Sequence, residues 1–183
     1  MCHLQLLPPK GLIRWAKLYK LYLCAFPAEE RKPFSMIVSM WKKGKTDVWS
    51  IEHNGRFAGL AITINSSDVI LLDYLAVAEK CRSQGVGTAA LRALRETYSC
   101  KGLFVEIEST LEAAPNLPQR QRRKRFYLSC GMAEMHTMAK LFGVNMELLG
   151  YDCRLDYDQY KAFYRDNYNH WAAEHIEKTV EMD

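Results

Sequence analysis

The first part of the chain contains two kinds of hydrophobic pattern. One has the spacing of amphipathic helices, and the other consists of short apolar runs typical of strands. From Gly11 to Ala25 apolar residues recur every three or four positions, which is typical of an amphipathic helix. Pro33 can open a second helix of the same kind, which Gly44 ends. Short apolar runs at 3–7, 48–53 and 56–64 predict strands, and the Asn54-Gly55 pair predicts a tight hairpin between the last two.

The second part of the chain continues the alternation. A strongly apolar strand, Val69 to Val77, runs into a turn with two glycines and then into a helix rich in alanine and leucine. The later elements are expected to be a strand at 103–108, a loop at 109–118, a helix at 119–130, strands at 133–142 and 145–151, and a tail helix from Asp156 to about Met182 with Tyr160, Tyr164, Tyr168 and Trp171 along one stripe. This order predicts an α/β (α+β) fold, and we expect residues 1–183 to form a single domain.

Composition and charge narrow the class of protein. The 183 residues are 49% hydrophobic and 25% charged, which suits a globular domain with a real core. The net charge of +4 is too mild to indicate nucleic acid by itself, although it suits a phosphate-bearing ligand. No run approaches the roughly 18 apolar residues of a membrane span, and no secretory signal is recognisable. We therefore expect a cytoplasmic protein whose six cysteines, which form no CxxC pair, are reduced.

The turn after Val77 is the clearest candidate binding site. A strand, a short glycine-containing turn and a helix N-terminus bring unpaired amides and the positive end of the helix dipole to one place. Arg82, Gly85 and Gly87 form R-x-x-G-x-G. This spacing is neither that of a nucleotide-hydrolysing P-loop nor that of a Rossmann turn. The turn therefore predicts a phosphate cradle of another kind.

Two motifs carry a resemblance to a known family. Leu75-Ala76-Val77 with Arg82-Ser83-Gln84-Gly85-Val86-Gly87-Thr88 resembles the acyl-CoA signature of the GNAT superfamily of N-acetyltransferases. Phe126 to Met132 resembles its second signature, F-Y-x-x-x-G-F, with Met132 in place of the last Phe. Phe26 to Arg31 and Leu141 to Val144 are most similar to bacterial members whose substrate is uncharacterised. The resemblance implies a mixed, mostly antiparallel sheet of about seven strands flanked by helices, with strands four and five parallel and splayed.

The resemblance also implies an activity and a cosubstrate. The expected reaction moves an acetyl group from acetyl-CoA to a primary amine, of a small molecule, a peptide N-terminus or a lysine, by direct attack. The amide of Leu75 would polarise the thioester carbonyl. Because Ser83 stands where the family often has a basic residue, the phosphate grip would rest on backbone amides and Arg82. The implied acetyl-CoA-binding residues are Leu75, Ala76, Val77, Arg82, Ser83, Gln84, Gly85, Val86, Gly87 and Thr88.

Three side chains are candidate catalytic groups. Asp73 lies on the same strand face as Leu75, in an otherwise apolar strand where an unpartnered carboxylate is costly. Glu106 matches the base of the family's ribosomal-protein acetyltransferases, although Glu108 on the same face is equally consistent with a polar surface. Tyr127 matches the family's general acid, which reprotonates the CoA thiolate, and its alternative role is a packed core aromatic.

Several alternatives stay open. The chain can instead be a non-catalytic acyl-CoA-binding module. The charge run at 120–125 is expected to be a solvated helix face, and its alternative roles are contacts with CoA or with nucleic acid. Cys81 and Cys130 are candidates for a ping-pong mechanism in which a cysteine is acylated first, but neither has an obvious histidine partner. The histidines have no metal-ligand spacing, so no metal is predicted. The tyrosine-rich tail allows a homodimer, and the acceptor amine is not identified by the sequence.

Overall fold

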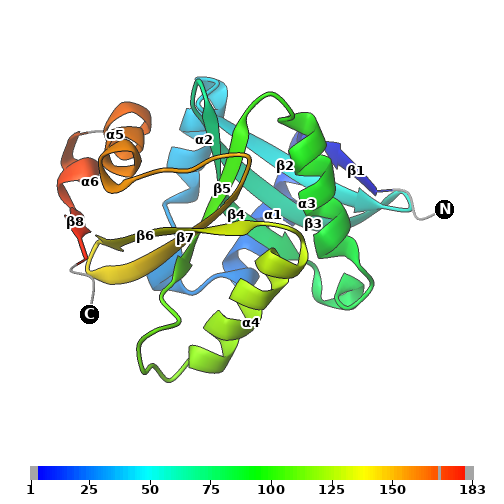
Figure 1. Cartoon of the computed structure of the whole chain (residues 1–183). Coiled ribbons are helices and arrows are strands. Elements are labelled where there is room, and N and C mark those ends of the chain that lie inside the picture. The colour runs from blue at the N-terminus through cyan, green and yellow to red at the C-terminus, as the bar shows by residue number, and fades with distance from the viewer. Residues whose placement is uncertain (1–3, 169, 180–183) are drawn as a thin grey trace. The chain divides into compact units, whose positions relative to one another are not determined.

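The structure, a computed structural model, describes residues 4–168 and 170–179 (Figure 1). Its strands are β1 (Leu4–Leu7), β2 (Thr46–His53), β3 (Arg56–Asn65), β4 (Val69–Val77), β5 (Gly102–Glu108), β6 (Ala133–Leu141), β7 (Val144–Tyr151) and β8 (Ile176–Lys178). Its α-helices are α1 (Gly11–Ala25), α2 (Phe34–Lys42), α3 (Val86–Thr97), α4 (Leu117–Ser129), α5 (Tyr157–Asn167) and α6 (His170–Glu174), and two short 3-10 helices are η1 (Ala28–Glu30) and η2 (Glu79–Cys81).

The strands form one mostly antiparallel sheet in the order β1-β2-β3-β4-β5-β7-β6-β8. Strands β4 and β5 are parallel, as the family resemblance implied. Their pairing covers only Val69 to Leu71 opposite Gly102 to Phe104, whereas β4 continues to Val77 and β5 to Glu108. The α/β fold with a mixed sheet flanked by helices is therefore confirmed.

One compact unit contains residues 4–65 and 72–99. On one side of its strands, α1 and α2 bury a core that includes Leu18, Tyr22, Ile37, Val48, Leu60, Ile62, Tyr74 and Ala76. Tyr98 ends α3 and donates its hydroxyl to Asp47 at 2.7 Å, while Trp49 donates to the same hydroxyl at 3.0 Å. Because Val48 and Trp49 are neighbours on β2, they point to opposite faces. The two helix layers therefore cover opposite faces of these strands.

A glycine sets the distance between two strands of this unit. A Cβ atom at Gly59 on β3 would lie 2.4 Å from the carbonyl oxygen of Ala76 on β4. No real side chain tolerates that contact, so only glycine allows the backbones to approach in this way. Gly59 therefore helps to place the end of β4, where the predicted acyl-CoA segment begins.

The other compact unit contains residues 66–71 and 100–179 of the described chain. Helix α5 packs on β5, with the rings of Phe163 and Phe104 5.2 Å apart and nearly perpendicular. A capping box begins α5, because Asp156 and Gln159 each accept a hydrogen bond from the other's backbone amide. Strand β5 pairs with β7 from Leu103 to Glu108.

The tail departs from its prediction. It is not one helix to about Met182: α5 ends at Asn167, α6 is short, and β8 adds an eighth strand that pairs with β6. The expected aromatic stripe does not continue to Trp171, whose side chain lies beyond α5 and is 59% exposed. The predicted helix end at Met182 lies outside the described residues. The remaining elements agree with the prediction within a few residues, and α4 begins slightly early, at Leu117.

No helix in the described part of the chain is both long enough and apolar enough to cross a lipid bilayer.

Candidate active site

The turn between β4 and α3 has the conformation of an anion cradle. Ser83 and Gly85 both adopt left-handed backbone conformations, with φ of 59° and 75°. Gly85 is the N-cap of α3, so the amides of Val86 and Gly87 have no acceptor within the helix. Successive amides in such alternating conformations converge on one point and suit an anion. The turn therefore has the strand–turn–helix arrangement that the sequence predicted, and its binding of a phosphate stays a prediction.

Two side chains brace this turn from within the same unit. Arg82 donates from Nε to the carbonyl oxygen of Val77 at 3.2 Å, and Gln84 donates to the carbonyl oxygen of Lys80 at 2.9 Å. Both side chains are otherwise exposed. Arg82 therefore ties the turn to the end of β4 while leaving guanidinium N–H groups that can face a phosphate.

The strand before the turn presents its faces as expected. Leu75 and Val77 are half-buried and alternate with Ala76, which is only 7% exposed and belongs to the core beneath α1. Asp73 shares the face of Leu75 and Val77. The side chains of the predicted acyl-CoA segment therefore divide between core packing and an accessible strand face.

Asp73 is an ion-paired carboxylate. The Nζ atom of Lys32 lies 2.7 Å from each of its two carboxylate oxygens, and the Asp73 side chain is 8% exposed. The Lys32 ammonium also lies 5.7 Å from the centre of the Tyr74 ring. The sequence predicted the position of Asp73 on its strand, but no local pattern identified Lys32 as its partner.

Tyrosines hold the backbone of the Lys32 segment. Lys32 donates its amide to the Tyr74 hydroxyl at 3.1 Å, and that hydroxyl donates to the carbonyl oxygen of Glu30 at 2.9 Å. Tyr22 donates to the carbonyl oxygen of Lys32 at 3.0 Å. Burial and the negative charge of Asp73 raise the pKa of Tyr74 well above its ordinary value, so this hydroxyl stays protonated. These bonds fix the position from which Lys32 reaches Asp73.

Glu106 belongs to the other unit and is also hydrogen-bonded. The hydroxyl of Tyr164 on α5 lies 2.9 Å from both carboxylate oxygens. Glu106 is half-buried on β5, opposite Leu148 of β7. Its neighbour Glu108 is paired with Arg120 at 2.8 Å. The polar surface expected around Glu108 is thus a specific ion pair.

Tyr127 lies on α4 and is buried, with 9% of its surface exposed. Burial raises the pKa of its hydroxyl to about 12, against a smaller lowering effect of the positive charge of Arg123. The hydroxyl is therefore protonated at neutral pH and able to donate. Glu106 and Tyr127 lie in one unit, and Asp73 and the 82–88 turn lie in the other.

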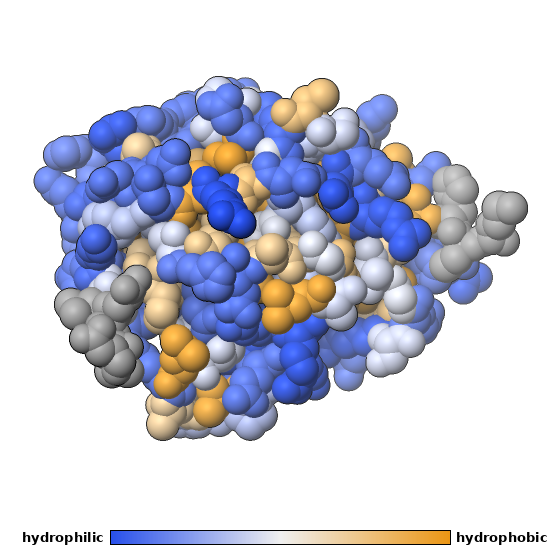
Figure 2. Space-filling view, viewed as in Figure 1, coloured by the Kyte–Doolittle hydropathy of each residue, from blue (hydrophilic) through white to orange (hydrophobic). Residues whose placement is uncertain are grey.

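The charge run on α4 is partly structural. Arg120 pairs with Glu108, and Lys124 lies 2.5 Å from Glu147 and 2.9 Å from Glu134. Although burial raises it, hydrogen bonds from Lys124 and Thr110 hold the pKa of Glu147 below its ordinary value. The remaining cations, Arg122, Arg123 and Arg125, are exposed, in line with the hydrophilic surface over α4 in Figure 2.

The cysteines and the side chains of metal-ligating types are the remaining candidate groups. Cys24, Cys81, Cys100, Cys130 and Cys153 form no disulfide bond with one another, and Cys2 lies outside the described residues. Within residues 4–168 and 170–179, no group of three or more His, Cys, Asp or Glu side chains could hold a metal ion.

Comparison with known proteins places this geometry in a family. Residues 15–132 match the model of the acetyltransferase (GNAT) family. No curated protein matches the chain in sequence. Many solved structures share its fold. One, assigned to the GNAT acetyltransferases of Bacteroides thetaiotaomicron, is 16% identical, with a TM-score of 0.75 over 93% of this chain and 98% of that one.

Two further structures of this fold hold acetyl-CoA or coenzyme A. A GNAT family acetyltransferase from Elizabethkingia anophelis with acetyl-CoA bound is 16% identical, with a TM-score of 0.58 over 83% of this chain and 98% of that one. An aminoglycoside 6'-N-acetyltransferase complexed with coenzyme A is 13% identical, with a TM-score of 0.67 over 84% and 99% of the two chains. Since the family model covers well over half of the sequence, including the β4–α3 turn and Tyr127, this chain belongs to the GNAT family of acetyltransferases.

Proposed function

We propose that this protein transfers an acetyl group from acetyl-CoA directly to a primary amine. The observation that carries the proposal is the left-handed turn at Ser83 and Gly85, which opens α3 inside the stretch that matches the family. Structures of the same fold hold acetyl-CoA or coenzyme A, which supports this choice of donor. No metal ion is needed for the proposed reaction.

The donor would lie along β4 and the turn that follows it. Backbone amides from Ser83 to Thr88 would hold the pyrophosphate at the positive end of α3. Leu75, Ala76 and Val77 would offer backbone groups to the pantetheine arm. The Leu75 amide would donate to the thioester oxygen, and one such donor contributes about 3–4 kcal/mol to transition-state stabilisation.

The acceptor must lose a proton before it attacks, because a lysine-type amine has a pKa of about 10.4. Asp73 and Glu106 are the proposed proton acceptors. Asp73 already holds the ammonium of Lys32 with both oxygens, so a cationic acceptor that replaced Lys32 would meet a site shaped for its charge. Glu106 binds the neutral hydroxyl of Tyr164, which can turn away at a smaller cost than a charge pair can be broken.

In the chemical step, the amine nitrogen attacks the thioester carbonyl carbon, the carbon–sulfur bond breaks, and CoA leaves as a thiolate. The nitrogen gives up a proton to solvent as the amide forms, and the thiolate takes up a proton from solvent. Tyr127 would serve this thiolate mainly as a hydrogen-bond donor. Its pKa of about 12 lies roughly 3 units above that of an ordinary thiol, so complete proton transfer is uphill by about 4–5 kcal/mol. Loss of the hydroxyl should therefore slow the reaction without abolishing it.

A second candidate function is a non-catalytic acyl-CoA-binding module. The Lys32–Asp73 ion pair favours it, because it neutralises one of the two proposed bases. The two functions predict different outcomes when the protein is mixed with acetyl-CoA and a panel of polyamines, aminoglycosides, lysine peptides and peptides with free N-termini. Amine-dependent thiol release supports the transferase. Binding of acetyl-CoA without release by any amine would support the module.

The same assay can identify the base. Asp73→Asn and Glu106→Gln are compared across the pH range with the best amine of the panel. The variant that lacks the base should lose kcat at every pH together with the acid limb of the kcat profile. The other variant should keep the shape of that profile, and a change in KM alone would assign that carboxylate to binding of the ammonium.

A further inference from the structure

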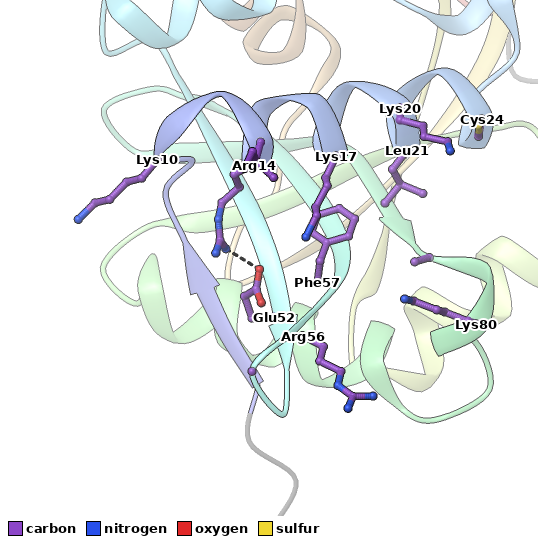
Figure 3. A pocket seen from close by; sticks show the side chains of 13 residues that line it. Lys10, Arg14, Lys17, Lys20, Leu21, Cys24, Glu52, Arg56, Phe57 and Lys80 are labelled. Atoms are coloured by element: carbon purple, nitrogen blue, oxygen red, sulfur yellow. Dashed lines mark hydrogen bonds and ion pairs between the residues drawn. The ribbon is translucent and has the colours of Figure 1, made fainter.

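A basic groove lies in the unit formed by residues 4–65 and 72–99 (Figure 3). Its volume is about 770 Å³. One wall is α1, another is the turn of the β2–β3 hairpin at Gly55 to Phe57, and the third is the segment after β4 with Ala78 and Lys80. Arg14 and Lys17 point from α1 toward the hairpin, and Lys80 points back from the opposite wall. The proposed CoA chemistry uses none of these side chains.

The groove concentrates positive charge. Six cations line it: Lys10, Arg14, Lys17, Lys20, Arg56 and Lys80. Its single acid is Glu52, which Arg14 engages at 2.5 Å and the Ser50 hydroxyl at 3.0 Å. Six positive charges and one negative charge leave a net of five, which exceeds the net charge of +4 of the entire chain. Arg14 is paired with Glu52, and the other five cations form no ion pair with a described residue.

The arrangement opposes the stability of α1. The helix contains no acidic residue, and its cations recur three or four positions apart, where like charges repel. Lys10 is its N-cap and Arg14 lies one turn later, so both stand at the positive end of the helix dipole. A helix face that only contacts solvent is more stable when it carries charges of both signs. Such a departure from local stability is typical of a binding surface.

The groove also has apolar walls that reach solvent. Ile13 is 76% exposed, and Leu21 and Phe57 are half-buried beside the cations. The lining thus mixes hydrophobic contacts with positive charge. From Lys10 to Cys24, α1 rises about 21 Å at about 1.5 Å per residue. That length matches about six residues of extended peptide.

We propose that this groove binds an acidic peptide segment that carries apolar side chains among its Asp and Glu residues. Charge complementarity selects an anionic chain, and Ile13, Leu21 and Phe57 suit its apolar side chains. Single-stranded nucleic acid usually stacks on several aromatic rings, whereas Phe57 is the one aromatic residue among those that line the groove. A lipid bilayer is a broad surface, and it fits a concave groove less well than a single chain does.

Fluorescence anisotropy with a labelled peptide tests the proposal. The probe is an N-acetylated peptide of about eight alternating Glu and Leu residues, and because it has no free amine its binding does not depend on transferase activity. We expect salt-sensitive binding that weakens at least tenfold in Lys17→Gln/Lys20→Gln. The control Lys42→Gln/Lys43→Gln removes the same charge from exposed positions at the end of α2 and should bind normally.

Melting temperatures show whether a loss of peptide binding in the groove variant comes from unfolding. Because Lys17 and Lys20 repel each other on α1, the groove variant should melt at the wild-type temperature or above it. Absence of peptide binding, or equal weakening in the control variant, would overturn the proposal. Groove-dependent binding of an oligouridylate or of phosphatidylserine vesicles, without binding of the peptide, would also overturn it and assign the groove to that polyanion.

Discussion

The Lys32 ammonium lies 2.7 Å from both carboxylate oxygens of Asp73, 41 residues away along the chain. This contact joins the segment before α2 to the middle of β4, two residues before the predicted oxyanion donor Leu75. Any role of Asp73 in catalysis therefore also involves Lys32.

Lys32→Met should destabilise the fold by about 1–3 kcal/mol, because it leaves the nearly buried Asp73 carboxylate without its counter-charge. In urea unfolding, Lys32→Met/Asp73→Asn should recover part of that loss. Lys140→Met, which breaks an exposed ion pair with Glu177, is the control and should cost at most about 1 kcal/mol. Equal losses in Lys32→Met and Lys140→Met would show that the buried pair has no special role.

Gly85→Ala should weaken CoA binding by about tenfold. Its φ of 75° costs an alanine about 1–2 kcal/mol, although a new Cβ would meet no atom within 4 Å, so the change alters the conformation of the turn without a clash. Gly143→Ala, at a φ of 84° and equally open, is the matched control for strain. Calorimetric titration with CoA should separate the two variants. A similar loss of affinity in both would argue against the cradle.

Tyr127→Phe should lower kcat by about tenfold or more while leaving the KM for acetyl-CoA nearly unchanged, as expected for a donor that acts on the departing thiolate. The same variant has a signature in stability. The pKa of Tyr127 in the folded protein, about 12, lies above its ordinary value of 10.0. The protonated hydroxyl therefore makes its full contribution to the stability of the wild type below pH 10, and this contribution is lost as the pH rises toward 12. Tyr127→Phe should flatten that alkaline loss in denaturation curves.

Glu147→Gln tests the ion-pair network beneath α4. The pKa of Glu147 is lowered in the folded state. The ionised carboxylate therefore stabilises the fold above pH 4.5, the ordinary pKa of a glutamate, and this stabilisation is lost as the pH falls toward the folded pKa. The variant should lose about 1–3 kcal/mol at pH 7 and show a flatter acid limb. Glu134→Gln removes the more exposed partner of Lys124 and should cost less. The reverse order would contradict the network described.

Local patterns predicted the elements whose signals are local. The Asn54-Gly55 turn adopts the left-handed pair of angles that a tight hairpin needs, with φ of 51° and 74°. The Asp156–Gln159 capping box and the Gly85 turn are also present. Each of these depends on residues within four positions of each other, so the sequence alone contains enough information to identify them.

The features that the sequence could not show depend on distant partners. Tyr164 meets Glu106 across 58 positions, and the Lys32–Asp73 pair has no short-range pattern. The tail was predicted as one helix because its aromatic spacing is helical. Strand β8 has only three residues and forms by pairing with Ala139 to Leu141 of β6, which local periodicity cannot reveal.

Acetyl-CoA labelled in its acetyl group distinguishes direct transfer from a route through an acylated enzyme. The wild-type protein is incubated with labelled acetyl-CoA, first alone and then with the amine that releases most thiol. We expect that the label stays on CoA until the amine is added and then appears on the amine, with none on the protein. Label on Cys81 or Cys130 before the amine is added, or no transfer to any amine, would contradict it.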